Sequence, residues 1–160
     1  MSGGAWIAPK SDDIDRILAS LADPAHAGVL TLVPREDLET ANESPDRALW
    51  VYYAEGKPLA FAYLSHFATE TPKLEEFAVF VKGMGIGAMA MGALIESLRG
   101  NPGFKRFWLH VATTNEPALR LYRKFGFGQD EFLPAHWTNR LGETIDLLRL
   151  WRSLDHPALI

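Results

Sequence analysis

The residues of this chain that could hold a phosphorylated ligand lie in one glycine-rich stretch. Lys82-Gly83-Met84-Gly85-Ile86-Gly87-Ala88 has three glycines at alternate positions. The apolar run Leu74–Val81 before it predicts a buried strand, and the small and apolar residues after it predict a helix with one apolar face. The first N–H groups of a helix lack partners and carry about half a positive charge. The stretch therefore predicts a diphosphate site, with backbone N–H groups as donors and Lys82 as an added charge.

The glycine-rich stretch is also compatible with roles that need no phosphate. The glycines could form a structural turn that lets strand and helix pack closely. A nucleotide-binding fingerprint is disfavoured, because the spacing is G-x-G-x-G and no Gly-Lys-Ser/Thr follows. A membrane span over Phe77–Ile95 is also disfavoured, since Lys82 interrupts it and two carboxylates precede it.

The pattern of the whole chain predicts a mixed α/β protein with one domain over residues 1–160. Ser11 is expected to cap a first helix that has Asp12 and Asp13 in its first turn, and Pro34 to begin a second, short one. Asn115 is expected to cap a later helix that Gly126 closes. Residues 29–33 are apolar and ambiguous. Strands are predicted at Trp6–Ala8, Ala48–Ala54, Leu59–Phe67, Phe107–Val111, Glu131–Trp137 and Thr144–Trp151.

Composition excludes several classes of function. The 160 residues are 48 % hydrophobic and 22 % charged, which is enough apolar material for one core. The net charge of −4 argues against a nucleic-acid binder, because the basic excess that neutralises phosphates is missing. There is no cysteine, and the histidines have no metal-ligand spacing, so neither a thiolate nor a metal site is expected. No secretory signal is present, which predicts a cytoplasmic protein with no membrane partner.

Two motifs, taken together and in order, resemble those of the GNAT superfamily of acyl-CoA-dependent N-acyltransferases. Its loop pattern, Gln/Arg-x-x-Gly-x-Gly/Ala, is met by Lys82, Gly85 and Gly87, with Lys in place of Gln or Arg. Its second signature is an Asn followed by a helix that ends Tyr-x-x-x-Gly-Phe. The matching residues are Asn115, Tyr122, Gly126 and Phe127. The resemblance implies a central, mostly antiparallel sheet of six to seven strands, splayed at its centre and flanked by about four helices.

The same resemblance implies a direct transfer of an acetyl group from acetyl-CoA to an amine in a ternary complex. The backbone of Phe77, Ala78 and Val79 would align the pantetheine arm like an added strand, and the Val79 N–H would stabilise the developing oxyanion. Tyr122 would protonate the leaving thiolate. Asn115 would cap its helix and contact the cofactor arm. A core tyrosine at helical spacing remains the alternative for Tyr122.

The acceptor amine must lose a proton before it attacks, and three residues are candidates for the base. Glu75 and Glu76 follow each other on the central strand, so alternation predicts that at most one points into the cleft. His110 lies on the neighbouring strand, where some members of the family carry a catalytic Glu, and its ordinary pKa near 6.5 suits a base. Deprotonation through water by none of the three is the alternative.

The acceptor is expected to be a small-molecule amine or a protein amino group, and the protein itself a monomer or homodimer. His136-Trp137 falls where the family's late loop often lines the acceptor site. Two other functions remain open. An acyl-CoA-binding sensor would keep the loop without needing Tyr122, and a fold relative that binds protein through its edge strands would not bind the cofactor.

Overall fold

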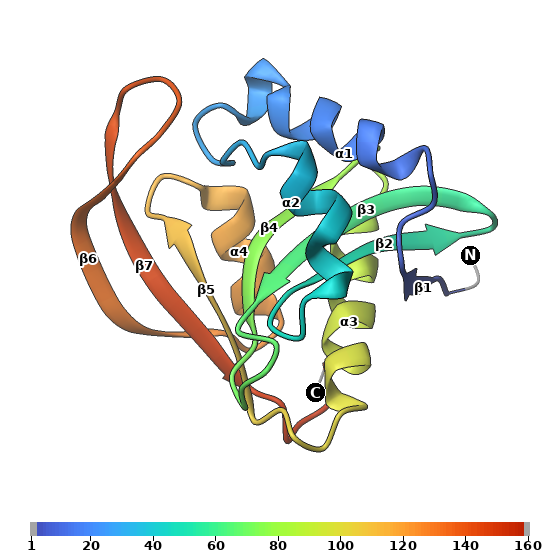
Figure 1. Ribbon diagram of the computed structural model, residues 1–160. Helices are drawn as coiled ribbons and strands as arrows, with labels where there is room; N and C mark the ends of the chain where they lie inside the picture. Colours follow the sequence, from blue (N-terminus) through green and yellow to red (C-terminus); the bar gives the residue numbers. More distant parts are fainter. Residues whose placement is uncertain (1–2, 159–160) are drawn as a thin grey trace.

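A twisted sheet forms the centre of the computed structural model, which describes residues 3–158 (Figure 1). Its strands lie in the order β1-β2-β3-β4-β5-β7-β6, and every neighbouring pair is antiparallel except β4 and β5. The strands are β1 (Ala5–Ile7), β2 (Ala48–Ala54), β3 (Lys57–Ser65), β4 (Lys73–Val79), β5 (Arg106–Ala112), β6 (Gly128–Thr138) and β7 (Thr144–Ser153). The seven strands in the described residues and the helices beside them confirm the predicted fold class.

The helices lie on both faces of the sheet. They are α1 (Asp13–Ala22), α2 (Arg35–Thr40), α3 (Ile86–Arg99) and α4 (Glu116–Lys124), with single 3₁₀ turns at Pro24–His26 and Ala41–Glu43. Figure 1 shows α1 and α2 over the face of β2–β4 that looks toward the viewer, while α3 and α4 lie behind the sheet. Within residues 3–158, none of these helices has the length and apolarity that a membrane crossing requires.

Each layer of helices buries its own apolar cluster. The cluster under α1 and α2 contains Ile17, Leu21, Leu49, Val51 and Phe61. The larger cluster, under α3 and α4, contains Leu94, Ile95, Phe107, Leu109 and Phe125. Burying such side chains contributes about 1.5–3 kcal/mol each, so these two clusters fix the sheet between its helices.

Local sequence signals explain the turn of the β2–β3 hairpin, but they do not predict how α1 begins. Glu55 and Gly56 both have positive φ, at 53° and 75°, which is the geometry of a tight turn between twisted strands. The prediction that Ser11 caps α1 is wrong. The fully buried carboxylate of Asp13 instead accepts a hydrogen bond from the Lys10 N–H at 2.8 Å and from the Tyr53 hydroxyl at 2.7 Å. Residues 29–33, ambiguous in the sequence, form no helix or strand.

The sheet opens between β4 and β5. These parallel strands are paired only at Lys73↔Trp108 and Leu74↔Leu109, and beyond that point β5 stays paired with β7 while β4 stays paired with β3. The register of β4 against β3 also shifts between Tyr63 and Leu64, which leaves Glu75 as the extra residue of a β-bulge. The splay expected from the family resemblance is therefore present, and it exposes one edge of β4 from Glu75 onward.

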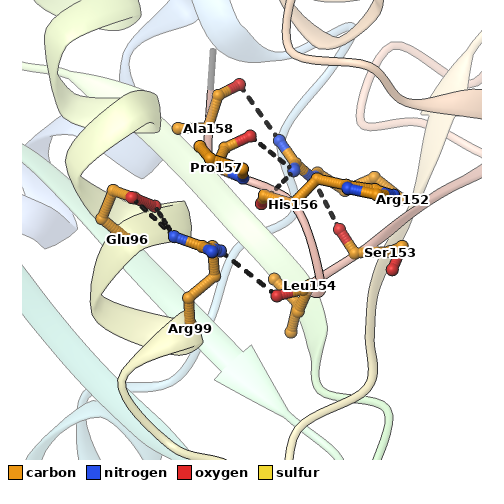
Figure 2. Close-up of polar contacts among 8 residues, drawn as sticks. All are labelled: Glu96, Arg99, Arg152, Ser153, Leu154, His156, Pro157 and Ala158. Carbon is orange, nitrogen blue, oxygen red and sulfur yellow. Dashed lines mark hydrogen bonds and ion pairs between the residues drawn. The ribbon is translucent and has the colours of Figure 1, made fainter. Parts of the chain in front are cut away.

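The C-terminal segment is held by one buried guanidinium (Figure 2). Arg152, only 5 % exposed, donates hydrogen bonds to five backbone carbonyl oxygens. These belong to Phe125 at 2.8 Å, Ser153 at 2.9 Å, His156 at 2.8 Å, Pro157 at 3.0 Å and Ala158 at 3.1 Å. Burial lowers the pKa of Arg152 from its ordinary value. We refer to Arg152 and these five carbonyls as the C-terminal clasp.

Candidate active site

A cleft of about 570 Å³ occupies the place where β4 and β5 separate. It gathers candidate residues from β4, β5, α4 and the glycine turn. The candidates that line it are Glu75, Glu76, Phe77, Ala78, Val79, Lys82, Gly87, His110, Asn115 and Tyr122. The other candidates, Gly83, Met84, Gly85, Ile86 and Ala88, belong to the turn and the first residues of α3, beside the lining.

The glycine turn leaves its backbone donors free. Gly83 and Gly85 have φ of 86° and 69°, a region that favours glycine because it has no Cβ. Gly85 is the N-cap of α3 and provides no side-chain hydrogen bond. Within residues 3–158, no N–H group of residues 82–88 donates to a protein acceptor. Because the helix dipole is positive here, the turn is suited to bind an anion.

The free edge of β4 continues this site. Phe77, Ala78 and Val79 pair with Ala62, Phe61 and Ala60 of β3 along one edge only. Their other edge faces the cleft, because β5 has already diverged. An unpaired strand edge presents N–H and C=O groups that an extended ligand can pair with.

Tyr122 reaches the cleft from α4. Asn115 caps this helix as predicted, since its side chain accepts a hydrogen bond from the Ala118 N–H at 3.4 Å. Tyr122 is 8 % exposed, and among the described residues its hydroxyl has no hydrogen-bond partner. Burial, with a smaller contribution from Glu76, raises the pKa of Tyr122 well above its usual range. The phenol is therefore protonated at neutral pH and free to donate.

The two carboxylates of β4 have different surroundings. Both residues contribute to the lining of the cleft, and the bulge at Glu75 interrupts the alternation that the sequence suggested. Glu75 accepts a hydrogen bond from Ser65 and pairs with Lys73 at 3.3 Å. Glu76 is 9 % exposed and accepts one hydrogen bond, from the Thr31 N–H at 3.2 Å. Burial, reinforced by the like charge of Glu75, raises the pKa of Glu76 to about 8.

His110 lies on the β5 side of the cleft, among other rings. Its centroid is 5.4 Å from that of Trp108 and 5.8 Å from that of His136. Burial, then the positive charge of Lys73 and the proximity of His136, lowers the pKa of His110. The imidazole is thus neutral at pH 7 and can accept a proton.

His136 is brought to the cleft by an irregularity in β6. The pairing of β6 with β7 skips from Leu133 to Trp137, and within this bulge Ala135 has φ of 48°. The Ala135 N–H donates to the Asp146 carboxylate at 2.7 Å, which stabilises the unusual backbone. Pro134 is the local signal for this bulge, because a proline within a strand favours an edge strand or a bulge. The family resemblance pointed to His136-Trp137.

The segment between α1 and α2 supplies residues that sequence reasoning missed. His26 and Thr31 both line the cleft. His26 is held by a contact of 2.7 Å between its Nδ1 and the Ser20 carbonyl oxygen, and Thr31 provides the amide that binds Glu76. Neither residue belongs to a recognisable motif. Only the packing of this loop against the sheet could identify them.

Comparison with known proteins places the chain in a family. Residues 15–127 match the sequence model of the Acetyltransferase (GNAT) family. This match covers more than half of the chain, and the chain therefore belongs to the GNAT family of acetyltransferases. No curated protein sequence matches it.

Solved structures of similar fold cover almost all of the chain. The ribosomal-protein-S18-alanine N-acetyltransferase from Escherichia coli matches with a TM-score of 0.75 and 18 % identity, over 96 % of this chain and 95 % of that one. The spermidine N-acetyltransferase from Vibrio cholerae, solved with CoA and spermine, matches with a TM-score of 0.79 and 15 % identity, over 96 % and 97 %. NAA60 from Arabidopsis thaliana, solved with a bisubstrate analogue, matches with a TM-score of 0.73 and 16 % identity, over 94 % of this chain and 97 % of that one. At these identities the likeness concerns the fold.

Proposed function

We propose that this protein transfers an acetyl group from acetyl-CoA to a primary amine of a small molecule or a protein, directly within a ternary complex. The observation that carries the proposal is the set of free N–H groups of residues 82–88, at the start of α3 and beside the open edge of β4. Membership of the GNAT family and the CoA bound in the Vibrio cholerae structure support the choice of cofactor.

In this proposal the backbone binds most of the cofactor. The N–H groups of residues 83–88 hold the diphosphate, and the ammonium of Lys82 adds an attractive charge as a point charge rather than a planar donor. The free edge of Phe77–Val79 pairs with the pantetheine arm, and the Val79 N–H donates to the carbonyl oxygen that becomes negative during attack. Asn115 caps α4 and contacts the arm.

The transfer forms a C–N bond and breaks the C–S bond. The neutral amine attacks the thioester carbon, the oxyanion collapses, and CoA leaves as a thiolate. The attacking nitrogen loses one proton as the amide forms, and this proton converts the thiolate to the free thiol. Tyr122 donates a hydrogen bond from its phenolic hydroxyl to that sulfur as it leaves. A thiol has an ordinary pKa of about 8.5, below that of a buried phenol, so a positioned hydrogen bond rather than a complete proton transfer lowers the barrier.

Among the three candidate bases, we favour His110. Its lowered pKa leaves it neutral at pH 7, whereas Glu76, with a pKa of about 8, is mostly protonated there and cannot accept a proton until the pH rises. Glu75 is engaged by Ser65 and Lys73. If water alone carries the proton, His110→Ala will leave kcat unchanged.

Two assays on the same protein test the proposal. Isothermal titration with acetyl-CoA measures binding, and thiol release with a panel of amines measures transfer. We expect Tyr122→Phe to lower kcat by about 10²–10⁴-fold while acetyl-CoA affinity stays the same. Binding without thiol release on any amine would instead indicate an acyl-CoA sensor. A protein that does not bind acetyl-CoA would indicate a protein-interaction module of this fold.

A further inference from the structure

One face of β5, β7 and β6 carries aromatic and charged side chains where a helix would otherwise cover the sheet. Phe107, Leu109 and Val111 of β5 point into the core under α3 and α4. The alternate residues Arg106, Trp108 and His110 therefore lie on the opposite face. Figure 1 shows α1 and α2 over β2–β4 but no helix of the described chain over this side of β5, β7 and β6.

A groove of about 270 Å³ lies on this face. It is lined by Thr71, Arg106, Trp108, Asp130, Arg149 and Trp151. Trp151 lies directly across from Trp108 in the β5–β7 ladder, so the two indoles are neighbours. Trp108 is fixed by a hydrogen bond of 3.0 Å from its indole N–H to the Thr71 carbonyl oxygen. The groove therefore has two aromatic walls, of which Trp108 is held in place by a hydrogen bond.

The charges in the groove leave one cation without a counter-ion. Arg149 is paired with Asp130 by two hydrogen bonds, at 2.9 and 3.2 Å. The guanidinium of Arg106 lies 4.1 Å from the centroid of the Trp151 ring, and within residues 3–158 it forms no ion pair. A guanidinium held over an aromatic ring retains its donors for a carboxylate.

The groove adjoins the proposed active site. Trp108 is one of its walls, and this ring is in contact with His110, which lines the cleft, at 5.4 Å between centroids. Arg106 and His110 are four residues apart on one strand, or about 13 Å at about 3.3 Å per residue. An extended peptide advances by the same distance per residue. A chain whose amino group is at His110 would therefore place its fourth or fifth residue near Arg106.

From this arrangement we infer that the acceptor is the amino-terminal segment of a protein, which lies extended across the β5 face with an acidic side chain, at about its fourth position, bound by Arg106. The inference rests on the proposed function, because it assumes that the amine is acetylated beside His110. Tryptophan and arginine are the residues that most often dominate protein interfaces. A small amine would leave the groove unused.

Peptide binding tests the inference without requiring catalysis. Peptides of about eight residues with a free amino terminus, neutral except for one Glu moved along the sequence, are labelled at the carboxyl end and titrated with the CoA-loaded protein by fluorescence anisotropy. We expect affinity to peak with Glu at positions three to five, about five- to tenfold above the same peptide with Gln there. Affinity that does not depend on the position of Glu would overturn the inference.

A charge exchange identifies the residue responsible. Arg106→Glu should weaken binding of the best peptide about tenfold. A peptide with Lys in place of its Glu should bind the Arg106→Glu variant with the affinity that the parent protein has for the Glu peptide. Lys57→Glu, the same charge change at the exposed start of β3, should have no effect on either peptide. Arg106→Gln gives a milder variant should the reversal impair folding. Equal weakening by the Lys57 variant, or no recovery with the Lys peptide, refutes the assignment.

The acetyl-CoA titration and a small-amine thiol-release assay separate this inference from the proposed function. If small amines are acetylated but no peptide binds, the docking surface is wrong and the proposed function stands. If acidic peptides bind through Arg106 but neither they nor small amines are acetylated, the transferase assignment is wrong and the docking surface stands.

Discussion

The cleft and the C-terminal clasp both contain a buried ionisable side chain, but the protein gives many hydrogen-bond partners to one and few to the other. Arg152 is surrounded by five carbonyl oxygens within 3.1 Å, whereas Glu76 receives one amide hydrogen bond. The same contrast holds for the backbone. The clasp binds the carbonyl of Phe125 and four carbonyls of the C-terminal segment, while the glycine turn leaves a row of N–H groups without a protein acceptor among the described residues.

This difference separates groups that are bonded within the fold from groups that the fold leaves free in the cleft. A buried polar group without a partner is unfavourable by about 1–3 kcal/mol, so a folded chain leaves few of them. The turn residues 82–85 are exposed, so water can bind their amides until an anion replaces it. Together with the Tyr122 hydroxyl and the free β4 edge, they give one cleft several polar groups that have no protein partner among the described residues. Four substitutions test the contrast.

The largest effect on stability is expected from Arg152→Met. Five carbonyls lose their donor, and we expect the free energy of unfolding to fall by about 3–5 kcal/mol in urea titration. Arg99→Met is the matched control, because Arg99 is more exposed and binds Glu96 and one carbonyl. That variant should lose no more than about 1 kcal/mol. Similar losses for both would mean that the clasp has no special role.

Glu76→Gln should change how stability depends on pH. The pKa of Glu76, about 8 in the folded protein, lies above its value in the unfolded chain, so the folded state binds the proton more tightly. The free energy of unfolding of the parent protein should therefore decrease by about 2–4 kcal/mol as the pH rises from about 5 to 8. The Gln variant should lack this decrease, and Glu75→Gln should retain it. If the free energy of unfolding depends on pH in the same way in the parent protein and in Glu76→Gln, the raised pKa of Glu76 is contradicted.

Lys82→Glu should affect binding rather than stability. Lys82 lines the cleft and forms no ion pair among the described residues, so we expect the free energy of unfolding to change by less than about 0.5 kcal/mol. The Kd for acetyl-CoA should rise about tenfold by titration calorimetry, because a negative charge would face the diphosphate. Lys57→Glu again serves as control. Unchanged affinity would remove Lys82 from the proposed site.

The smallest effect is expected at the β6 bulge. Ala135 has φ of 48°, so Ala135→Gly should relieve backbone strain and stabilise the protein by about 0.5–1 kcal/mol in urea titration. Ala68→Gly, at an exposed loop position without positive φ, should instead be neutral or slightly destabilising. If Ala135→Gly also destabilises, the bulge is not strained and another force presents His136 to the cleft.

Sequence reasoning predicted the glycine turn and the start of α4, which border the candidate site, because both depend on local signals. The three alternate glycines marked the turn, and Asn115 marked the start of α4 through its own capping hydrogen bond. It failed at Ser11, where a distant hydroxyl, that of Tyr53, helps hold Asp13 in the cap region instead. It also missed His26 and Thr31, whose roles arise only when the loop between α1 and α2 packs on the sheet.

The amino-acid sequence by itself determined the elements and their order, since alternation, glycine and capping residues act over a few positions. It also determined where bare helix amides would lie, because only glycine readily adopts the backbone of residues 83 and 85. The tertiary structure alone decided that β4 and β5 part after Leu74, that Glu76 is buried with a raised pKa, and that Arg152 binds the C-terminal carbonyls. Those features depend on contacts between distant segments and on the loss of water around a charge, neither of which has a local signature in the sequence.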